Sequence, residues 1–101
     1  MIKSELIQRL AIKQPHLRHD DVDLAVTLLL NQLINELASG GRVEIRGFGA
    51  FSLKHYKARR GRNPKTGQTV SVPQRYSVYF KPGDDMRTRV NASAGEHKIV
   101  R

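Results

Sequence analysis

The chain has 101 residues, a formal charge of +9 at pH 7 and a pI near 10.5. This length fits one domain, and the lack of cysteine excludes disulfides and thiolate metal sites. So large a positive charge indicates nucleic acid or an anionic membrane as partner, but no apolar run approaches the roughly 20 residues of a membrane-spanning helix. We therefore expect neither a signal peptide nor a membrane protein.

Two helices are predicted in the N-terminal part. The first covers residues 4–13, because apolar residues recur on one helical face, Ser4 is a capping-type residue and Pro15 ends the pattern. The second covers residues 19–38, with acidic residues in its first turn and a serine and two glycines directly after it.

The second predicted helix is apolar around most of its circumference, with only a narrow polar stripe, whereas a monomer's surface helix normally has one apolar face. A chain this small cannot cover such a helix on both sides, so we infer a partner subunit. The alternative is a monomer in which this helix is fully buried. The predicted dimer interface contains Val26, Leu29, Leu30, Leu33, Ile34, Leu37, Phe48 and Phe51.

Three strands and a short helix are predicted next. Residues 42–46 alternate strictly, a tight turn at residues 47–49 leads into a second strand, and residues 75–81 form a third. The last helix runs from Asp84 to about residue 90, and residues 93–101 are expected to be a flexible tail. The strand residues expected to face inward are Val43, Ile45, Phe51, Leu53, Val78 and Phe80.

The most unusual stretch is residues 59–67, where three arginines and a lysine surround Pro64 between two glycines. Strand-like runs on either side predict a β-hairpin arm of about residues 54–74. No aspartate or glutamate occurs from Ile45 to Gly83, although ordinary surfaces mix both signs of charge, so a phosphate backbone is the indicated ligand. The alternative is a solvated basic turn. The cations of this span are Arg46, Lys54, Lys57, Arg59, Arg60, Arg62, Lys65, Arg75 and Lys81.

Catalytic chemistry has little support in the sequence. The histidines His16, His19, His55 and His97 are scattered and form no metal-ligand pair, and the acidic pairs mark helix starts. We therefore expect no enzyme, no metal, no cofactor and no small-molecule ligand.

Two motifs, Gly47-Phe48-Gly49-Ala50-Phe51 and Gly61-Arg62-Asn63-Pro64-Lys65-Thr66-Gly67, resemble the signature of the HU/IHF family of bacterial nucleoid proteins. Residues 3–7 and 80–83 match as well, and the resemblance covers about residues 1–92, the expected DNA-binding domain. Within the family the chain looks most like beta subunits of integration host factor, because HU tends to carry an apolar residue where Arg46 stands.

The resemblance implies an α+β fold and an obligate, intertwined dimer. Two N-terminal helices and a short C-terminal helix join a three-stranded antiparallel sheet, which extends into β-ribbon arms. HU and integration host factor are themselves established examples of proteins whose arms bend double-stranded DNA through its minor groove. The implied partner is the alpha subunit of integration host factor, the implied location is the cytoplasmic nucleoid, and the implied roles are in recombination, replication, transcription and translation. The alternative is an HU-like homodimer with little sequence preference.

The resemblance also implies roles for individual residues. Pro64 maps onto the family's intercalating wedge, which opens one base step and kinks the duplex. Glu44 either forms a salt bridge across the strands or fixes the direction of Arg46. The residues that flank the wedge are Arg60, Arg62, Asn63 and Lys65, those on the reading strand are Arg42, Glu44 and Arg46, and those that clamp DNA on the body are Lys3, Ser4, Lys81 and Arg87.

The sequence departs from the family pattern at two places before the tail. Tyr56 stands where many relatives carry arginine, and Asp84-Asp85 is unusually acidic for a helix start that would hold a phosphate. An RNA-binding or ribosome-associated basic protein is a further alternative, which the sequence disfavours because RNA readers usually stack bases on exposed aromatic residues of a sheet. With the phenylalanines expected inward, the only candidates for such stacking are Tyr56, Tyr76 and Tyr79.

Overall fold

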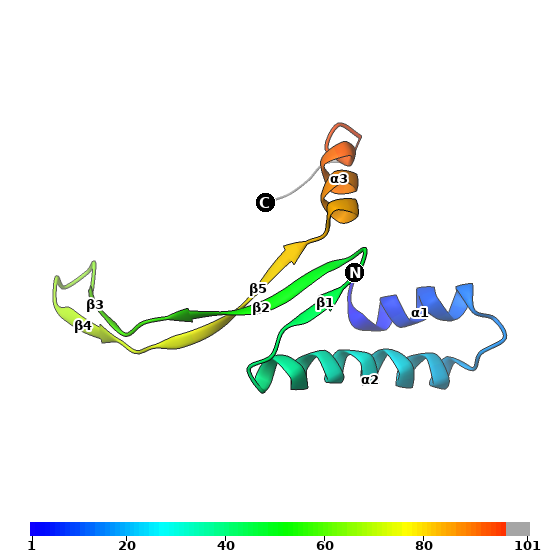
Figure 1. Ribbon diagram of the computed structural model, residues 1–101, viewed down its shortest axis with the longest axis horizontal. Coiled ribbons are helices and arrows are strands. Elements are labelled where there is room, and N and C mark those ends of the chain that lie inside the picture. The colour runs from blue at the N-terminus through cyan, green and yellow to red at the C-terminus, as the bar shows by residue number, and fades with distance from the viewer. Residues whose placement is uncertain (97–101) are drawn as a thin grey trace.

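The computed structural model describes residues 1–96, in which two helices form a hairpin at the N-terminal end (Figure 1). They are α1 (Lys3–Lys13) and α2 (His19–Ala38), and the predicted bounds of α2 are confirmed. Gly40, at φ +89°, follows α2 in the left-handed region that favours glycine. The predicted cap at Ser4 is wrong, because Ile2 precedes α1 without any side-chain cap and Ser4 lies inside the first turn.

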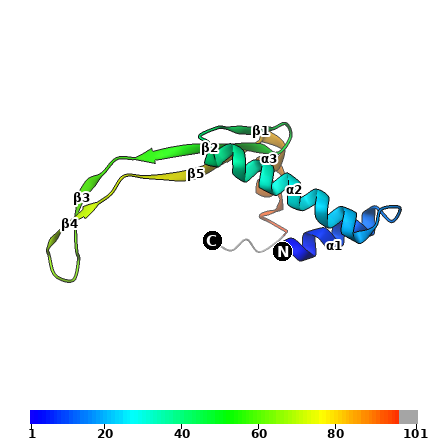
Figure 2. The ribbon, with the colours of Figure 1, turned by 90° about the horizontal axis from the view of Figure 1, so that it is seen from below.

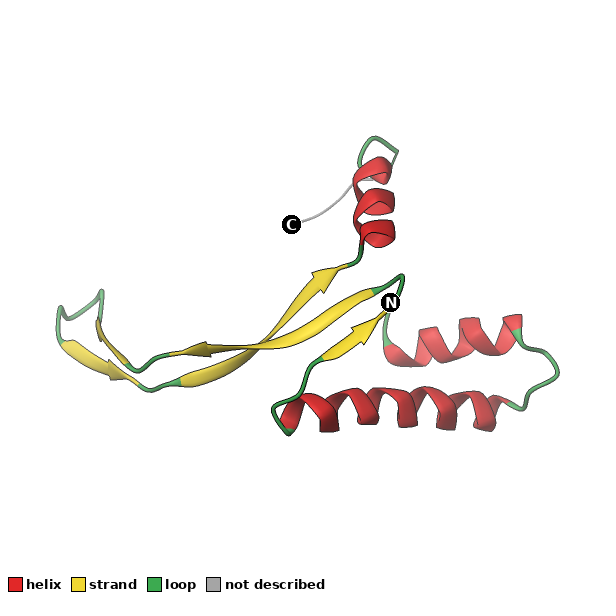
Figure 3. Cartoon of the chain, in the orientation of Figure 1, coloured by secondary structure: helices red, strands yellow, loops and turns green. Residues whose placement is uncertain are grey.

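The predicted three-stranded antiparallel sheet is confirmed (Figure 3). Its strands are β1 (Val43–Ile45), β2 (Gly49–Tyr56) and β5 (Arg75–Pro82), in the order β1-β2-β5. Phe51 of β2 lies opposite Val43 on one side and Phe80 on the other, and the ring centroids of the two phenylalanines are 4.7 Å apart. This contact marks the apolar face of the sheet.

The arm is a continuation of β2 and β5 away from the body (Figure 2). After the Tyr56–Arg75 pair, the ladder is interrupted and resumes as a two-stranded sheet of β3 (Arg59–Arg62) and β4 (Thr69–Val72). Pro73 lies in the gap on the return strand, where it cannot donate a ladder hydrogen bond. The Cα radius of gyration is 19.4 Å, against about 13 Å for a compact domain of this length, because the arm contributes length but little core.

The last helix, α3 (Asp84–Ser93), extends beyond the predicted end near residue 90. The Gly83 N–H donates to the Phe48 carbonyl at 2.8 Å and ties the start of α3 to the turn between β1 and β2. Residues 94–96 form a turn, and the remainder of the predicted tail, residues 97–101, lies outside the described residues. Within residues 1–96, no helix is both long and apolar enough to cross a membrane.

The buried core is very small in the single chain. Within residues 1–96 its only buried apolar side chains are Ile7, Val22 and Val26, where α1 packs on α2. Leu28 and Leu29 on α2 remain 59% and 61% exposed, so the monomer with a fully buried α2 is excluded. Large exposed apolar patches mark interfaces, which supports a partner subunit. Two residues predicted to face inward, Ile45 and Val78, are exposed for the same reason: no described part of the chain covers them.

Candidate nucleic-acid interface

Strand alternation gives the sheet one apolar face and one charged face. Glu44 lies opposite Ala50, and Ala50 lies opposite Lys81, so these three share the side away from the phenylalanines. Lys54 and Arg75 fall on the same side further along β2 and β5, where the arm begins. We call this surface the cationic face. Its charged residues, all exposed, are Arg42, Glu44, Lys54, Arg75 and Lys81.

Arg46 follows β1 and borders an open depression that is also lined by Glu44 and Lys81. Glu44 accepts a hydrogen bond from Arg42 Nε at 2.9 Å, along the same strand. The predicted salt bridge across two strands is therefore wrong, and within residues 1–96 Glu44 forms its ion pair with Arg42 and not with Arg46. The guanidinium of Arg46 has no carboxylate partner within residues 1–96.

The arm carries its positive charge without neutralisation. The ion pairs in the described part of the chain are confined to the body, and none involves an arm residue. No carboxylate occurs between Glu44 and Asp84, so the arm cannot form one with its own residues. A positive electrostatic potential of this kind attracts polyanions. The exposed arm cations are Lys54, Lys57, Arg59, Arg60, Arg62, Lys65 and Arg75.

The outer ribbon of β3 and β4 carries two valines on one side and has arginines on both sides. Gly61 lies opposite Val70, and a Cβ on Gly61 would meet the Val72 Cγ2 atom at 3.3 Å, so this glycine lets the two valines cover the backbone. Arg60 and Arg62 project from the other side of β3, because they alternate with Gly61. Arg59 lies opposite Val72 and so shares the side of the two valines, while Arg60 and Arg62 occupy the other side with Ser71 and Thr69.

The tip of the arm is held by a compact set of hydrogen bonds. The Asn63 N–H donates to the Gln68 carbonyl at 2.8 Å, and the Gly67 N–H donates to the Asn63 carbonyl at 2.7 Å. The Lys65 N–H donates to Asn63 Oδ1 at 2.9 Å and closes a turn around Pro64. Pro64 is exposed, and its ring is rigid and apolar. A small apolar group is thus displayed at the far end of a charged arm.

The predicted body contacts are not all brought together. Lys81 lies near the end of β5, close to the start of α3. Lys3 and Ser4 lie on α1, whose N-terminal end is away from β1 in Figure 2. Arg87 donates to Asp84 Oδ1 at 2.8 Å, so an acid already occupies part of its donor set. A phosphate at Arg87 would compete with this carboxylate.

The predicted dimer residues form a largely uncovered apolar surface. Val26 is the exception, because α1 buries it within the chain. Leu29, Ile34 and Phe48 are exposed, while the others are half-buried: Leu30, Leu33, Leu37 and Phe51.

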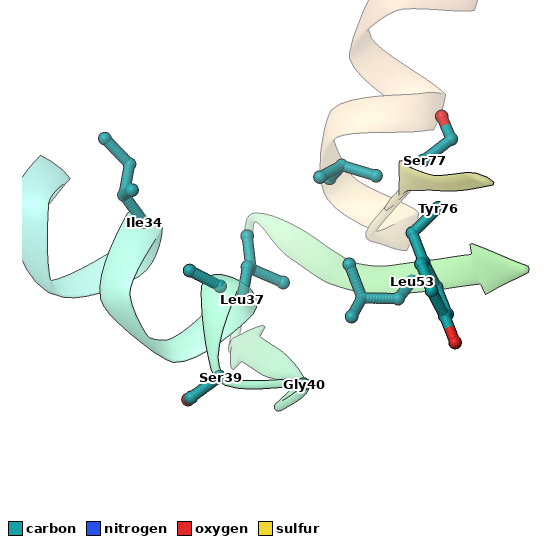
Figure 4. A pocket seen from close by; sticks show the side chains of 9 residues that line it. Ile34, Leu37, Ser39, Gly40, Leu53, Tyr76 and Ser77 are labelled. Carbon is teal, nitrogen blue, oxygen red and sulfur yellow. The ribbon is translucent and has the colours of Figure 1, made fainter.

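An open apolar groove continues this surface between the end of α2 and the root of the arm. Figure 4 shows Ile34 and Leu37 on α2 and Leu53 and Tyr76 on the strands, and Val78 completes this lining. Phe48, Phe51 and Phe80 cluster on the same apolar face, with ring centroids 4.7–6.4 Å apart.

Two cation–π contacts on the cationic face are not predicted from the sequence. Lys54 Nζ lies 4.7 Å from the ring centroid of Tyr79, and Arg75 Cζ lies 4.9 Å from that of Tyr56. The signal available in the sequence is the period-two spacing of Lys54 and Tyr56, but their partners on β5 depend on the register.

The described residues of the site form an exposed, charged surface. No group of three histidine, aspartate or glutamate side chains within residues 1–96 is placed to hold a metal ion. What the site combines is an extended cationic face, an arm without acids and a rigid apolar tip.

Comparison with known proteins gives the same picture. A beta subunit of integration host factor from Alkalilimnicola ehrlichii is 57% identical over 100 residues, which cover 99% of this chain and 98% of that protein. A beta subunit from Thioalkalivibrio sulfidiphilus is 58% identical over 92 residues, or 91% of this chain and 96% of that protein.

Solved structures agree with the fold. Anabaena HU in a cocrystal with DNA superimposes with a TM-score of 0.78 at 33% identity, covering 89% of this chain and 97% of that one. The family model for bacterial DNA-binding proteins matches residues 1–91. The chain therefore belongs to this family, the HU and integration host factor group, as its motifs predicted.

Proposed function

We propose that this chain is the beta-type subunit of an integration host factor, an architectural protein that bends double-stranded DNA. The observation that carries this proposal is the arm, in which no cation has an acidic partner among residues 1–96 and Pro64 is displayed at the tip. The two beta subunits of integration host factor at 57% and 58% identity support the subunit type.

Bending follows from the balance of two free energies. Opening one base step costs about a few kcal/mol, and bending a short duplex smoothly costs about 1–6 kcal/mol. Each phosphate brought onto a lysine or arginine releases counterions and returns part of that cost. The arm supplies cations along its length, and the rigid ring of Pro64 loses little entropy when it inserts.

The partner in this proposal is an alpha-type subunit. The exposed apolar residues of α2 and the groove at the root of the arm would be buried against it, and a second arm would come from that subunit. Leu29 and Ile34, at 61% and 60% exposure, are the most open of the proposed interface residues. The heterodimer would assist recombination, replication, transcription and translation in the cytoplasmic nucleoid, by binding DNA without catalysis.

The proposed DNA contacts divide by position. Pro64 acts as the wedge, Arg42 and Arg46 lie where part of the target sequence is read, and Glu44 holds Arg42. The phosphate contacts on the arm are Lys54, Lys57, Arg59, Arg60, Arg62, Asn63, Lys65 and Arg75, and those on the body are Lys3, Ser4, Lys81 and Arg87.

Energy transfer between dyes at the two ends of a duplex of about 35 base pairs tests this function, because a free duplex of that length is nearly straight. The chain is titrated alone and then with an alpha-type subunit. We expect high transfer only with the partner. High transfer with the chain alone would indicate an HU-like homodimer, and binding without transfer would remove bending from the proposed function.

A further inference from the structure

Two aromatic rings lie under two cations at the root of the arm. Tyr56 is directly opposite Arg75, and Tyr79 pairs with Ser52, one diagonal from Lys54, so both rings share the cationic face with their partners. The distances of 4.7 Å for Lys54 and 4.9 Å for Arg75 are within the roughly 6 Å range of cation–π attraction.

An aromatic ring and a carboxylate restrain a basic side chain in different ways. Elsewhere in the chain, Arg42 and Arg87 each donate to an acid, at 2.9 and 2.8 Å, which occupies N–H groups and cancels charge. A guanidinium stacked over a ring keeps its N–H edges free, and an ammonium keeps the donors that point away from the ring. Since the arm contains no acid, its root restrains Lys54 and Arg75 without neutralising them.

We infer that Tyr56 and Tyr79 are positioning residues that hold Arg75 and Lys54 ready for DNA phosphates where the duplex passes from body to arm. This inference rests on the proposed DNA-binding function. Long basic side chains lose rotamer freedom when they bind, and a side chain already restrained by a ring loses less of it. Tyr56, which has no charge at neutral pH, thus contributes to binding through Arg75.

The opposite face of the ribbon has side-chain contacts of its own, so replacing Tyr56 or Tyr79 leaves those contacts in place. His55 lies 4.8 Å from Tyr76 between ring centroids, and its Nε2 atom is 3.1 Å from Gln74 Oε1. Tyr56 and Tyr79 are 42% and 44% exposed, so their removal leaves no buried cavity. Variants at these positions are expected to keep the fold.

The test is a double-mutant cycle for affinity, with the assembled protein and a fluorescent duplex of about 35 base pairs. Tyr79→Leu should weaken binding by about two- to five-fold, the range of an exposed cation–π contact. Tyr79→Phe keeps the ring and should bind like the unmodified protein. In a Lys54→Gln background, Tyr79→Leu should cause no further loss, because the residue that the ring positions has gone.

Three results would overturn the inference. Tyr79→Leu could bind as tightly as the unmodified protein, it could weaken binding equally with and without Lys54, or Tyr79→Phe could bind as weakly as Tyr79→Leu. The last result would assign a direct DNA contact to the tyrosine hydroxyl.

If thermal unfolding shows that Tyr79→Leu has lost its fold, a second cycle with Tyr56→Leu, Tyr56→Phe and Arg75→Gln tests the same positioning role at the other ring.

Binding of the unmodified protein separates this inference from the proposed function. If it binds the duplex and the ring variants behave identically to it, only the positioning role is overturned. If it does not bind the duplex, the proposed function is overturned together with the inference.

Discussion

Arg46 and Arg42 stand on either side of β1, yet they differ in what holds them. Arg42 donates to Glu44 at 2.9 Å, whereas Arg46 has no acidic partner within residues 1–96 and faces an open depression beside Lys81. A guanidinium free of carboxylates keeps all of its donors for a base edge or a phosphate. Arg46 is therefore better suited than Arg42 to read a base.

Arg46→Ala is expected to weaken binding to preferred sites more than binding to random duplex. The difference should be about 1–3 kcal/mol if the guanidinium contacts a base, since phosphate contacts do not distinguish sequences. Competition binding with the two duplexes at one salt concentration measures it. Arg9→Ala, an exposed arginine on α1 that removes the same charge away from the cationic face, is the control. Equal losses on both duplexes would reduce Arg46 to a phosphate contact.

Side-chain partners are the part of the site that the sequence predicts least well. Glu44 has basic residues on both sides at equal spacing, so spacing alone cannot choose Arg42 over Arg46. Tyr56 meets Arg75 only because the hairpin register places them opposite each other across a long connection. Ser4 has the chemistry of a cap, but the helix begins one residue earlier and leaves it without that role.

The arm's tip is an element whose shape depends on backbone conformation. Gly67 has φ +70° and donates to the Asn63 carbonyl at 2.7 Å, which closes the turn around Pro64. A residue with a Cβ pays about 1–2 kcal/mol in this left-handed region, except that asparagine enters it more readily.

Gly67→Ala is therefore expected to loosen the tip and lower affinity for duplex DNA, by up to about 1–2 kcal/mol if binding requires the closed turn. Gly67→Asn is the matched variant and should lose less. Titration of one labelled duplex compares all three proteins, and amide exchange at Lys65 reports whether its hydrogen bond to Asn63 has opened. Identical affinities for the alanine and asparagine variants would show that the turn conformation does not matter for binding.

Element boundaries follow the sequence closely where one local pattern decides them. The bounds of α2 are predicted correctly, because acidic residues mark its start and glycines mark its end. The interruption between β2 and β3 is not predicted, since Lys57-Ala58 carries no turn signal. On the return strand Pro73 gives a reason for the break, because it lacks the N–H that a ladder bond needs.

At the scale of the whole molecule, the main feature is that a single chain buries very few of its apolar side chains. The three buried apolar side chains among residues 1–96 make a core far too small for a domain of this size. The apolar surface that remains uncovered lies on α2 and on one face of the sheet. Sequence patterns predict this shortage, because α2 is apolar on too many sides. They do not predict the geometry of the partner's contacts, which depends on residues that another subunit supplies.

Thermal stability should consequently depend on protein concentration, because assembly stabilises the folded state by mass action. The melting temperature of the purified protein is expected to rise when its concentration is increased over a wide range. Leu29→Asp should lower it strongly by placing a charge on the apolar face, while Asn31→Asp, on the polar stripe of the same helix, should change it little. A melting temperature that is independent of concentration would contradict an obligate dimer.

In the proposed function, DNA bending depends on Pro64 at the tip of an arm whose cations have no acidic partner among residues 1–96. The most direct test compares end-to-end energy transfer at saturation for the assembled protein and its Pro64→Ala variant, with affinity measured in the same titration. The variant is expected to keep much of its affinity, since every cation remains, but to produce a clearly smaller bend. Equal transfer for the two proteins at saturation would contradict this role of Pro64 and leave the arms as phosphate clamps alone.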